Sequence, residues 1–262
     1  MIPYSYILID FSDIEQDPPA GFAFLKSCGY AGVELNLTDD VLGRLDELEA
    51  AAQANDLVVP SMLTGPAYEQ GLCLSSPDPD CRQGAVDRLK SYLPIADRFN
   101  AILVVGLMQG LRSDEADPVV ANERIAAGLR EVGLAAEQKG IEIVIEPVNH
   151  LQVGFNNSLA EVRQLIAAID VPAFKPMLDT IHMNIEETSM TEPIYSCGES
   201  LRHVHICESN GGVFGSGNVD FKSVLHALQS IGYEGFGSLK IYRNAGFEEG
   251  ARSSIEYLRS QS

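Results

Sequence analysis

Eight short apolar runs alternate with helix-like stretches along the chain, and this alternation constrains its fold more than any other feature. The runs are typical of buried strands and cover residues 4–10, 32–37, 58–63, 102–108, 141–147, 174–179, 202–207 and 237–242. Residues 39–56, 81–100 and 121–140 carry apolar side chains at helical spacing. This order predicts a (β/α)8 barrel that spans residues 1–262 as a single domain. A doubly wound sheet is the main alternative, but no GxGxxG or phosphate-binding loop follows any run.

The composition limits the classes of partner. With 262 residues, 45% of them hydrophobic, the chain is long enough to bury a full core. We expect a soluble, cytoplasmic protein, because no run approaches a membrane span and the N-terminal residues lack the basic start of a signal peptide. The formal charge of −19 argues against nucleic acid and anionic membranes as partners. Five cysteines without a CxxC pair favour reduced thiols over disulfides.

Side chains of the kind that bind metal ions gather at the ends of the apolar runs in the second half of the chain. They are Glu146 in IVIEPVNH, Asp179 and His182 in MLDTIHMNIEE, and His203, His205 and Glu208 in HVHICESN. Buried polar groups need partners, so their clustering at successive strand ends indicates a shared site rather than core packing.

Strand periodicity predicts which of these side chains point into the barrel. Alternate residues of a strand face opposite sides, so the carboxylate of Glu34 points inward. The same rule directs Asp179, His205 and Lys240 toward one mouth of the barrel. Carboxylates and an imidazole around one point form a site for a divalent cation such as Mn2+, Mg2+, Co2+ or Zn2+.

Several segments carry a family resemblance, among them GYAGVELN, IVIEPVN, LDTIHMNIEE and HVHICESNGGVFGSGNVDF. With them the chain resembles the xylose-isomerase-like (AP-endonuclease-like) TIM-barrel superfamily, and within it the sugar isomerases and epimerases that include the ketose 3-epimerases. The resemblance covers nearly all of the chain. It implies that Glu146, Asp179 and His205 bind a divalent metal ion, Mn2+ foremost, and that Glu146 also acts as a base. It further implies that His182 and Glu208 contact metal-bound water or substrate hydroxyls, and that the protein forms a homo-oligomer.

Three positions depart from the epimerase pattern. Lys240 stands where the pattern carries a glutamate that serves as the fourth metal ligand and the second base. Gly211 replaces a substrate-binding arginine, and His150 replaces an arginine that follows the fifth strand. Three roles are open for Lys240: general acid or base, binding of a substrate carboxylate, or a structural ion pair with Glu146. His150 is a second candidate for proton transfer.

We therefore expect a metal-dependent isomerase or epimerase that acts on a small carbohydrate, a keto-sugar or sugar acid, through an enediolate. One alternative is a metal-dependent lyase on a 3-oxo sugar, either decarboxylating a 3-oxo sugar acid or eliminating from a 3-oxo-glycoside. A non-catalytic sugar-binding subunit is a further alternative, whereas the acidic composition argues against an AP endonuclease. Glu34 is either a substrate contact or a satisfied inward carboxylate. His203 is expected to orient the metal-binding histidine rather than bind metal itself.

Overall fold

The structure, a computed structural model, describes residues 2–243 and 245–261. Within them, eight strands follow one another around a closed barrel in the order β1 to β8, with helices between them, which confirms the predicted (β/α)8 fold class. The strands are β1 (Tyr4–Leu8), β2 (Gly32–Asn36), β3 (Ser61–Leu63), β4 (Ile102–Val105), β5 (Ile143–Ile145), β6 (Phe174–Asp179), β7 (His203–Cys207) and β8 (Gly237–Lys240).

Each of the eight predicted runs contains a strand, but most strands are shorter than their runs, and β3 and β5 have only 3 residues each. Of residues 58–63, only Ser61–Leu63 form β3, while Val58 makes an isolated bridge with Gly32. Pro60 explains the late start, because proline has no N–H to donate to a strand ladder.

The chain packs as two compact units. One contains the residues up to Pro60 together with those from Leu178 onward, and the other contains Ser61–Met177. The expectation of a single domain over residues 1–262 stays a prediction. Among the described residues, no helix combines the length and the apolar character that crossing a membrane requires.

The helices of the first unit are α1 (Pro18–Cys28), α2 (Asp39–Leu42), α3 (Leu45–Ala54), α8 (Thr180–Glu186), α9 (Glu192–Cys197), α10 (Phe221–Ser230) and α11 (Phe247–Gln261), with short 3-10 turns at Phe11–Asp13 and Gly198–Ser200. The helix predicted over residues 39–56 is thus divided into α2 and α3. Gly43 closes α2, since its backbone N–H bonds back to Asp39, and glycine has the lowest helix propensity after proline. The sequence pattern was right about the helical stretch and wrong about its continuity.

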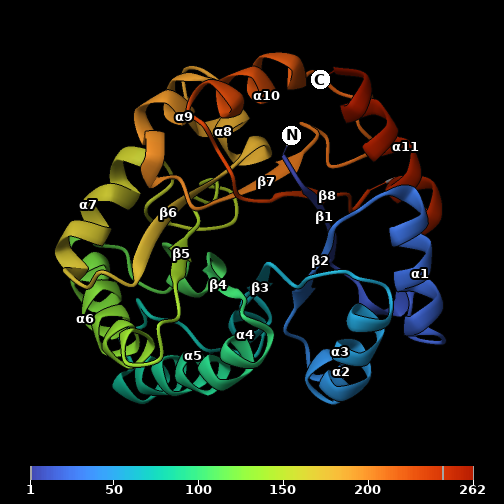
Figure 1. Cartoon of the computed structure of the whole chain (residues 1–262). Helices are drawn as coiled ribbons and strands as arrows, with labels where there is room; N and C mark the ends of the chain where they lie inside the picture. The colour runs from blue at the N-terminus through green and yellow to red at the C-terminus, as the bar shows by residue number, and fades with distance from the viewer. Residues whose placement is uncertain (1, 244, 262) are drawn as a thin grey trace. The chain divides into compact units, whose positions relative to one another are not determined.

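Helices from opposite ends of the sequence lie side by side in the first unit. α11, in red in Figure 1, packs against α1, in blue. Arg259 of α11 donates hydrogen bonds to the backbone oxygens of Cys28 and Gly29, each 3.0 Å long. The Tyr30 hydroxyl donates to the Ala251 oxygen at 2.8 Å. The two Arg259 bonds satisfy carbonyls at the end of α1 that the helix itself cannot pair, and the Tyr30 bond ties the following residue to α11.

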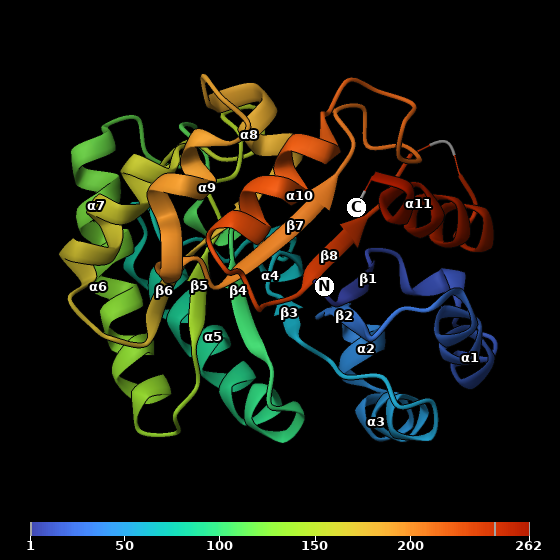
Figure 2. The same ribbon diagram turned by 45° about the horizontal axis from the view of Figure 1, so that its top comes forward.

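The second unit carries α4 (Pro66–Glu69), α5 (Pro79–Phe99), α6 (Pro118–Glu137), α7 (Leu159–Ile169) and a 3-10 turn at Leu107–Gln109. Figure 2 shows α5, α6 and α7 side by side, and neighbouring members of this row are in contact. α5 and α6 begin two or three residues before the predicted positions 81 and 121. Asp78 and Asp117 cap them, each followed by a proline whose missing N–H costs nothing in the first turn.

Candidate active site

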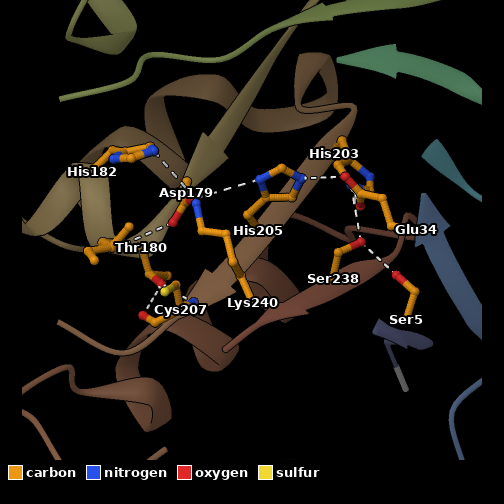
Figure 3. A network of polar contacts seen from close by, with 11 residues as sticks. Ser5, Glu34, Asp179, Thr180, His182, His203, His205, Cys207, Ser238 and Lys240 are labelled. Carbon is orange, nitrogen blue, oxygen red and sulfur yellow. Dashed lines mark hydrogen bonds and ion pairs between the residues drawn. The ribbon is translucent and has the colours of Figure 1, made fainter. Parts of the chain in front are cut away.

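Asp179 is the point on which the polar side chains of the first unit converge. It is the last residue of β6 and the N-cap of α8, and its Oδ1 accepts a hydrogen bond of 3.0 Å from the backbone N–H of Ile181. Its Oδ2 contacts the Nζ of Lys240 and lies 3.6 Å from both His182 Nε2 and His205 Nδ1 (Figure 3). One carboxylate oxygen therefore supports the helix while the other faces three basic side chains.

The charges around Asp179 decide its ionisation. The side chain is fully buried, which by itself would raise the pKa of the carboxyl group. The Lys240 ammonium and the His182 and His205 imidazoles outweigh burial and hold the pKa of Asp179 well below its usual range. Asp179 is therefore a carboxylate paired with an ammonium at neutral pH.

Glu34 of β2 bridges the two histidines of β7. Its Oε1 lies 2.9 Å from His205 Nε2, and its Oε2 lies 3.0 Å from His203 Nε2. Burial raises the pKa of Glu34, but the charges and hydrogen bonds of His205 and His203 hold that pKa well below its usual range. Because a carboxylate can only accept, both Nε2 atoms must donate.

A buried chain of hydroxyls continues from His203. Ser238 Oγ lies 3.2 Å from His203 Nε2 and shares a 2.6 Å hydrogen bond with Ser5 Oγ. Strand register brings these groups together, since Ser238 of β8 pairs with Ser5 of β1 on one side and with His205 of β7 on the other. Figure 3 shows the network running from Ser5 to His182.

Thr180 fixes the start of α8 against the end of β7. Its Oγ1 donates to the Cys207 backbone oxygen at 2.6 Å and accepts from the Cys207 N–H at 2.7 Å. Thr180 follows Asp179, and Cys207 stands two residues after His205. This pair of hydrogen bonds therefore sets the spacing between the Asp179 carboxylate and the His205 imidazole.

Glu34, His203 and His205 also form a group whose potential ligand atoms all lie within 4.8 Å of one another. These three residues are engaged with one another rather than arranged around an ion, because the Nε2 atoms of both imidazoles are directed at the Glu34 carboxylate. This geometry supports the reading of Glu34 as a satisfied inward carboxylate that orients His205. Its prediction as a substrate contact stays a prediction.

Glu146 and His150 belong to the second unit. Glu146 directly follows β5 and is buried, and its backbone N–H donates to the Val105 oxygen at 2.9 Å. Gly106 makes room for the side chain, since a Cβ there would stand 2.7 Å from Glu146 Oε2. His150 is exposed in the turn that follows. Both residues thus follow the strand that the sequence assigned to them, and their functional roles stay predictions.

A comparison with known proteins identifies the family. A family model described as "Xylose isomerase-like TIM barrel" matches residues 22–261. The chain belongs to this family. A D-psicose 3-epimerase from Ruminiclostridium cellulolyticum is 31% identical over 226 residues, covering 85% of this chain and 74% of that protein. A ketose 3-epimerase from Arthrobacter globiformis is 28% identical over 214 residues, covering 80% and 72%. A 3-dehydro-D-guloside 4-epimerase from Escherichia coli is 24% identical over 223 residues, covering 82% and 83%.

Solved structures agree on the family fold. A D-allulose 3-epimerase from Methylomonas sp. superposes with a TM-score of 0.85 at 22% identity, covering all of this chain and 98% of that one. At this identity the match supports the xylose isomerase-like barrel alone.

Glu208 has a different setting from the one expected for a residue that contacts substrate in this family. Its Oε1 accepts from the backbone N–H groups of Ser209 at 2.8 Å and Val219 at 3.1 Å, and its Oε2 accepts from Gly215 at 3.0 Å. The carboxylate is fully buried and holds both ends of the loop after β7. This geometry does not support the predicted contact of Glu208 with substrate hydroxyls or metal-bound water, which stays untested.

At Gly211, where the family resemblance implies an arginine, the ring of Tyr242 fills the space that a side chain would need. The sequence did not reveal this contact. The φ of Gly211 is +72°, and a Cβ there would stand 2.6 Å from the ring of Tyr242. The backbone N–H of Tyr242 donates to the Gly211 oxygen at 3.0 Å. Tyr242 is 39% exposed. Burial of the remainder and the Cys207 thiol raise the pKa of its phenol, and Lys240 opposes the rise. An aromatic ring beside Lys240 thus covers the backbone from which the arginine would extend.

Proposed function

We propose that this chain is a sugar isomerase or epimerase that acts on a keto-sugar or sugar acid through an enediolate. The observation that carries the proposal is the convergence of Lys240, His182 and His205 on the buried Oδ2 of Asp179. Hydrogen-bond donors and positive charge are the groups that would stabilise an enediolate oxygen, and this cluster supplies both. The 31% identical D-psicose 3-epimerase supports a ketose as the substrate class.

The reaction needs proton transfer and no oxidant. A base removes the proton from the carbon beside the carbonyl, and the electron pair moves onto the carbonyl oxygen. Return of a proton to the opposite face gives the epimer, and return to the neighbouring carbon gives the isomer. Glu146 is our candidate for the base, carried over from the family pattern, and Lys240 and His150 are the candidates for returning the proton.

A divalent ion, Mn2+ foremost and Mg2+, Co2+ or Zn2+ as alternatives, is part of the sequence-based prediction. Glu146, Asp179 and His205 would hold it, and when bound it would polarise the carbonyl and the adjacent hydroxyl. The Lys240 ammonium already contacts the Oδ2 of Asp179, so the residues as they stand do not fit such an ion, and no step of the reaction is assigned to it. The cytoplasmic location and the homo-oligomer likewise stay predictions.

The alternatives have less support. A lyase on a 3-oxo sugar would also pass through an enolate, but the relatives described above are named as epimerases. A non-catalytic sugar-binding subunit would bind a sugar without turnover.

The test is to incubate the protein in D2O with a panel of ketoses, 3-oxo sugar acids and 3-oxo-glycosides, with and without Mn2+, followed by NMR and mass spectrometry. Deuterium in a product of unchanged heavy-atom composition is the expected result. Loss of carbon dioxide or of an aglycone would identify a lyase, and sugar binding without any product would identify a binding subunit. Either outcome would refute the proposal.

A matched pair of variants locates the chemistry. Asp179→Asn keeps an N-cap, because asparagine caps as well as aspartate, but it removes the charge facing Lys240. Asp220→Asn makes the same change at the exposed N-cap of α10, where Asp220 accepts from the N–H of Ser223. We expect Asp179→Asn to lower turnover by about 100-fold or more. Asp220→Asn should match the wild type.

A further inference from the structure

The two carboxylate oxygens of Asp179 have different partners, one in the cap of α8 and one in the candidate site. Oδ1 is held by the Ile181 N–H, and Oδ2 faces Lys240. Any cation that binds Oδ2 therefore meets the Lys240 ammonium at the same atom. The lysine is only 12% exposed, so water does little to screen its charge from this carboxylate.

The backbone fixes the pairing of Lys240 with Asp179. Lys240 is the last residue of β8 and lies opposite Cys207 of β7 in the strand register. The backbone of Cys207 is bonded on both sides to the hydroxyl of Thr180, the residue after Asp179. The ammonium and the carboxylate are thus placed by neighbouring strands and a helix cap rather than by a chance contact of a long side chain.

The candidate ligand atoms already have partners. Within residues 2–243 and 245–261, no buried side-chain nitrogen or oxygen lacks a hydrogen-bond partner. A divalent ion at Asp179 would have to displace Lys240 and would be repelled by its charge.

We propose that the Lys240 ammonium is the resident cation of this site and takes the place at Asp179 that a divalent metal ion would otherwise occupy. The catalytic role of the ammonium rests on the proposed function, because it assumes a reaction that passes through an enediolate. There the ammonium stabilises the enediolate oxygen as a charged hydrogen-bond donor. The binding claim concerns this chain's own residues and holds for any reaction.

Calorimetric titration with MnCl2, without sugar, tests the inference on the full chain. The comparison includes the wild type, Lys240→Glu, Lys240→Gln and Lys222→Glu. Lys222 is exposed on α10, so its replacement makes the same change in charge away from the site. We expect Lys240→Glu to bind Mn2+ at least about 100-fold more tightly than the wild type, because it removes a repelling charge and adds a carboxylate ligand. Lys240→Gln should gain less, and Lys222→Glu should gain nothing. Adding Asp179→Asn to Lys240→Glu should abolish the gain.

Contrary outcomes are equally definite. A wild type that purifies with one equivalent of a divalent ion, or binds Mn2+ as tightly as Lys240→Glu, overturns the inference. If Lys240→Glu does not fold, Lys240→Gln decides, and an affinity no tighter than that of the wild type overturns the inference. If a substrate is found, we expect EDTA to leave the wild-type rate unchanged. A chain that turns over no sugar would refute the proposed function and leave the titration result intact.

Discussion

Replacing Glu34 with alanine should lower the free energy of unfolding by about 3–5 kcal/mol, because it removes one partner from a buried charged cluster. The carboxylate accepts from His205 Nε2 at 2.9 Å and from His203 Nε2 at 3.0 Å, and all three side chains are buried. Hydrogen bonds to a charged group contribute about 1.5–3 kcal/mol each, so two of them give about 3–6 kcal/mol, which agrees with this loss. The variant leaves the His203 and His205 imidazoles without their acceptor, and it leaves a cavity where the Glu34 side chain was.

The expected loss is a large part of a typical stability of about 5–15 kcal/mol. At about 2–4 °C per kcal/mol for a chain of this size, the Tm should fall by roughly 6–20 °C. Calorimetric thermal scans and urea titrations measure it. Glu34→Gln should cost less, about 1–3 kcal/mol, because one imidazole can move its proton to Nδ1 and accept from the new amide.

The control for Glu34→Ala is Glu47→Ala on α3. The Glu47 side chain is 44% exposed, so its removal should change the free energy of unfolding by no more than about 0.5 kcal/mol. If Glu34→Ala unfolded at the same temperature as Glu47→Ala, the bridge between the histidines would carry no stability and our account of it would be wrong.

Three further outcomes follow from the same structure. Gly211→Arg should destabilise the protein by at least about 1–2 kcal/mol, the cost of a left-handed non-glycine residue, and displace Tyr242; an unchanged Tm and tyrosine fluorescence would contradict this. Glu208→Ala should cost about 2–4 kcal/mol and make the loop after β7 sensitive to proteolysis, since its backbone donors lose a charged acceptor; limited digestion against the wild type is the check. A thiol reagent should label Cys81 first, because the other four cysteines are buried and burial raises the pKa of Cys73; fast labelling of more than one thiol would refute it.

Much of the barrel could be predicted because strand and helix periods are local properties of a sequence. The alternation within β2 and β7 is enough to direct Glu34, His203 and His205 to one face. The pairing of Lys240 with Asp179 could not be predicted, because it depends on the register between β7 and β8 and on the cap of α8. The sequence placed Lys240 at the site and offered Glu146 as a possible ion-pair partner, but it gave no sign of the pair with Asp179.

Glu208 shows another limit of reading a strand by its period. The family resemblance implied a site residue, whereas the strand period points its side chain away from the barrel axis, so its direction depends on how the backbone turns at Ser209. The glycines of that loop were the available signal. A Cβ at Gly217 would stand 2.4 Å from Glu208 Oε1, so a bare backbone there lets the chain close around the carboxylate.

The first unit is assembled from both ends of the chain, and this has a consequence during synthesis. Ser5 and its partner Ser238 are separated by 233 positions, so a ribosome adding about 5–20 residues per second needs roughly 10–50 s between them. Throughout that interval β1 has no β8 to pair with and presents an open edge. We therefore expect the nascent chain to depend on chaperones for longer than a protein of equal length whose strands pair only with sequence neighbours.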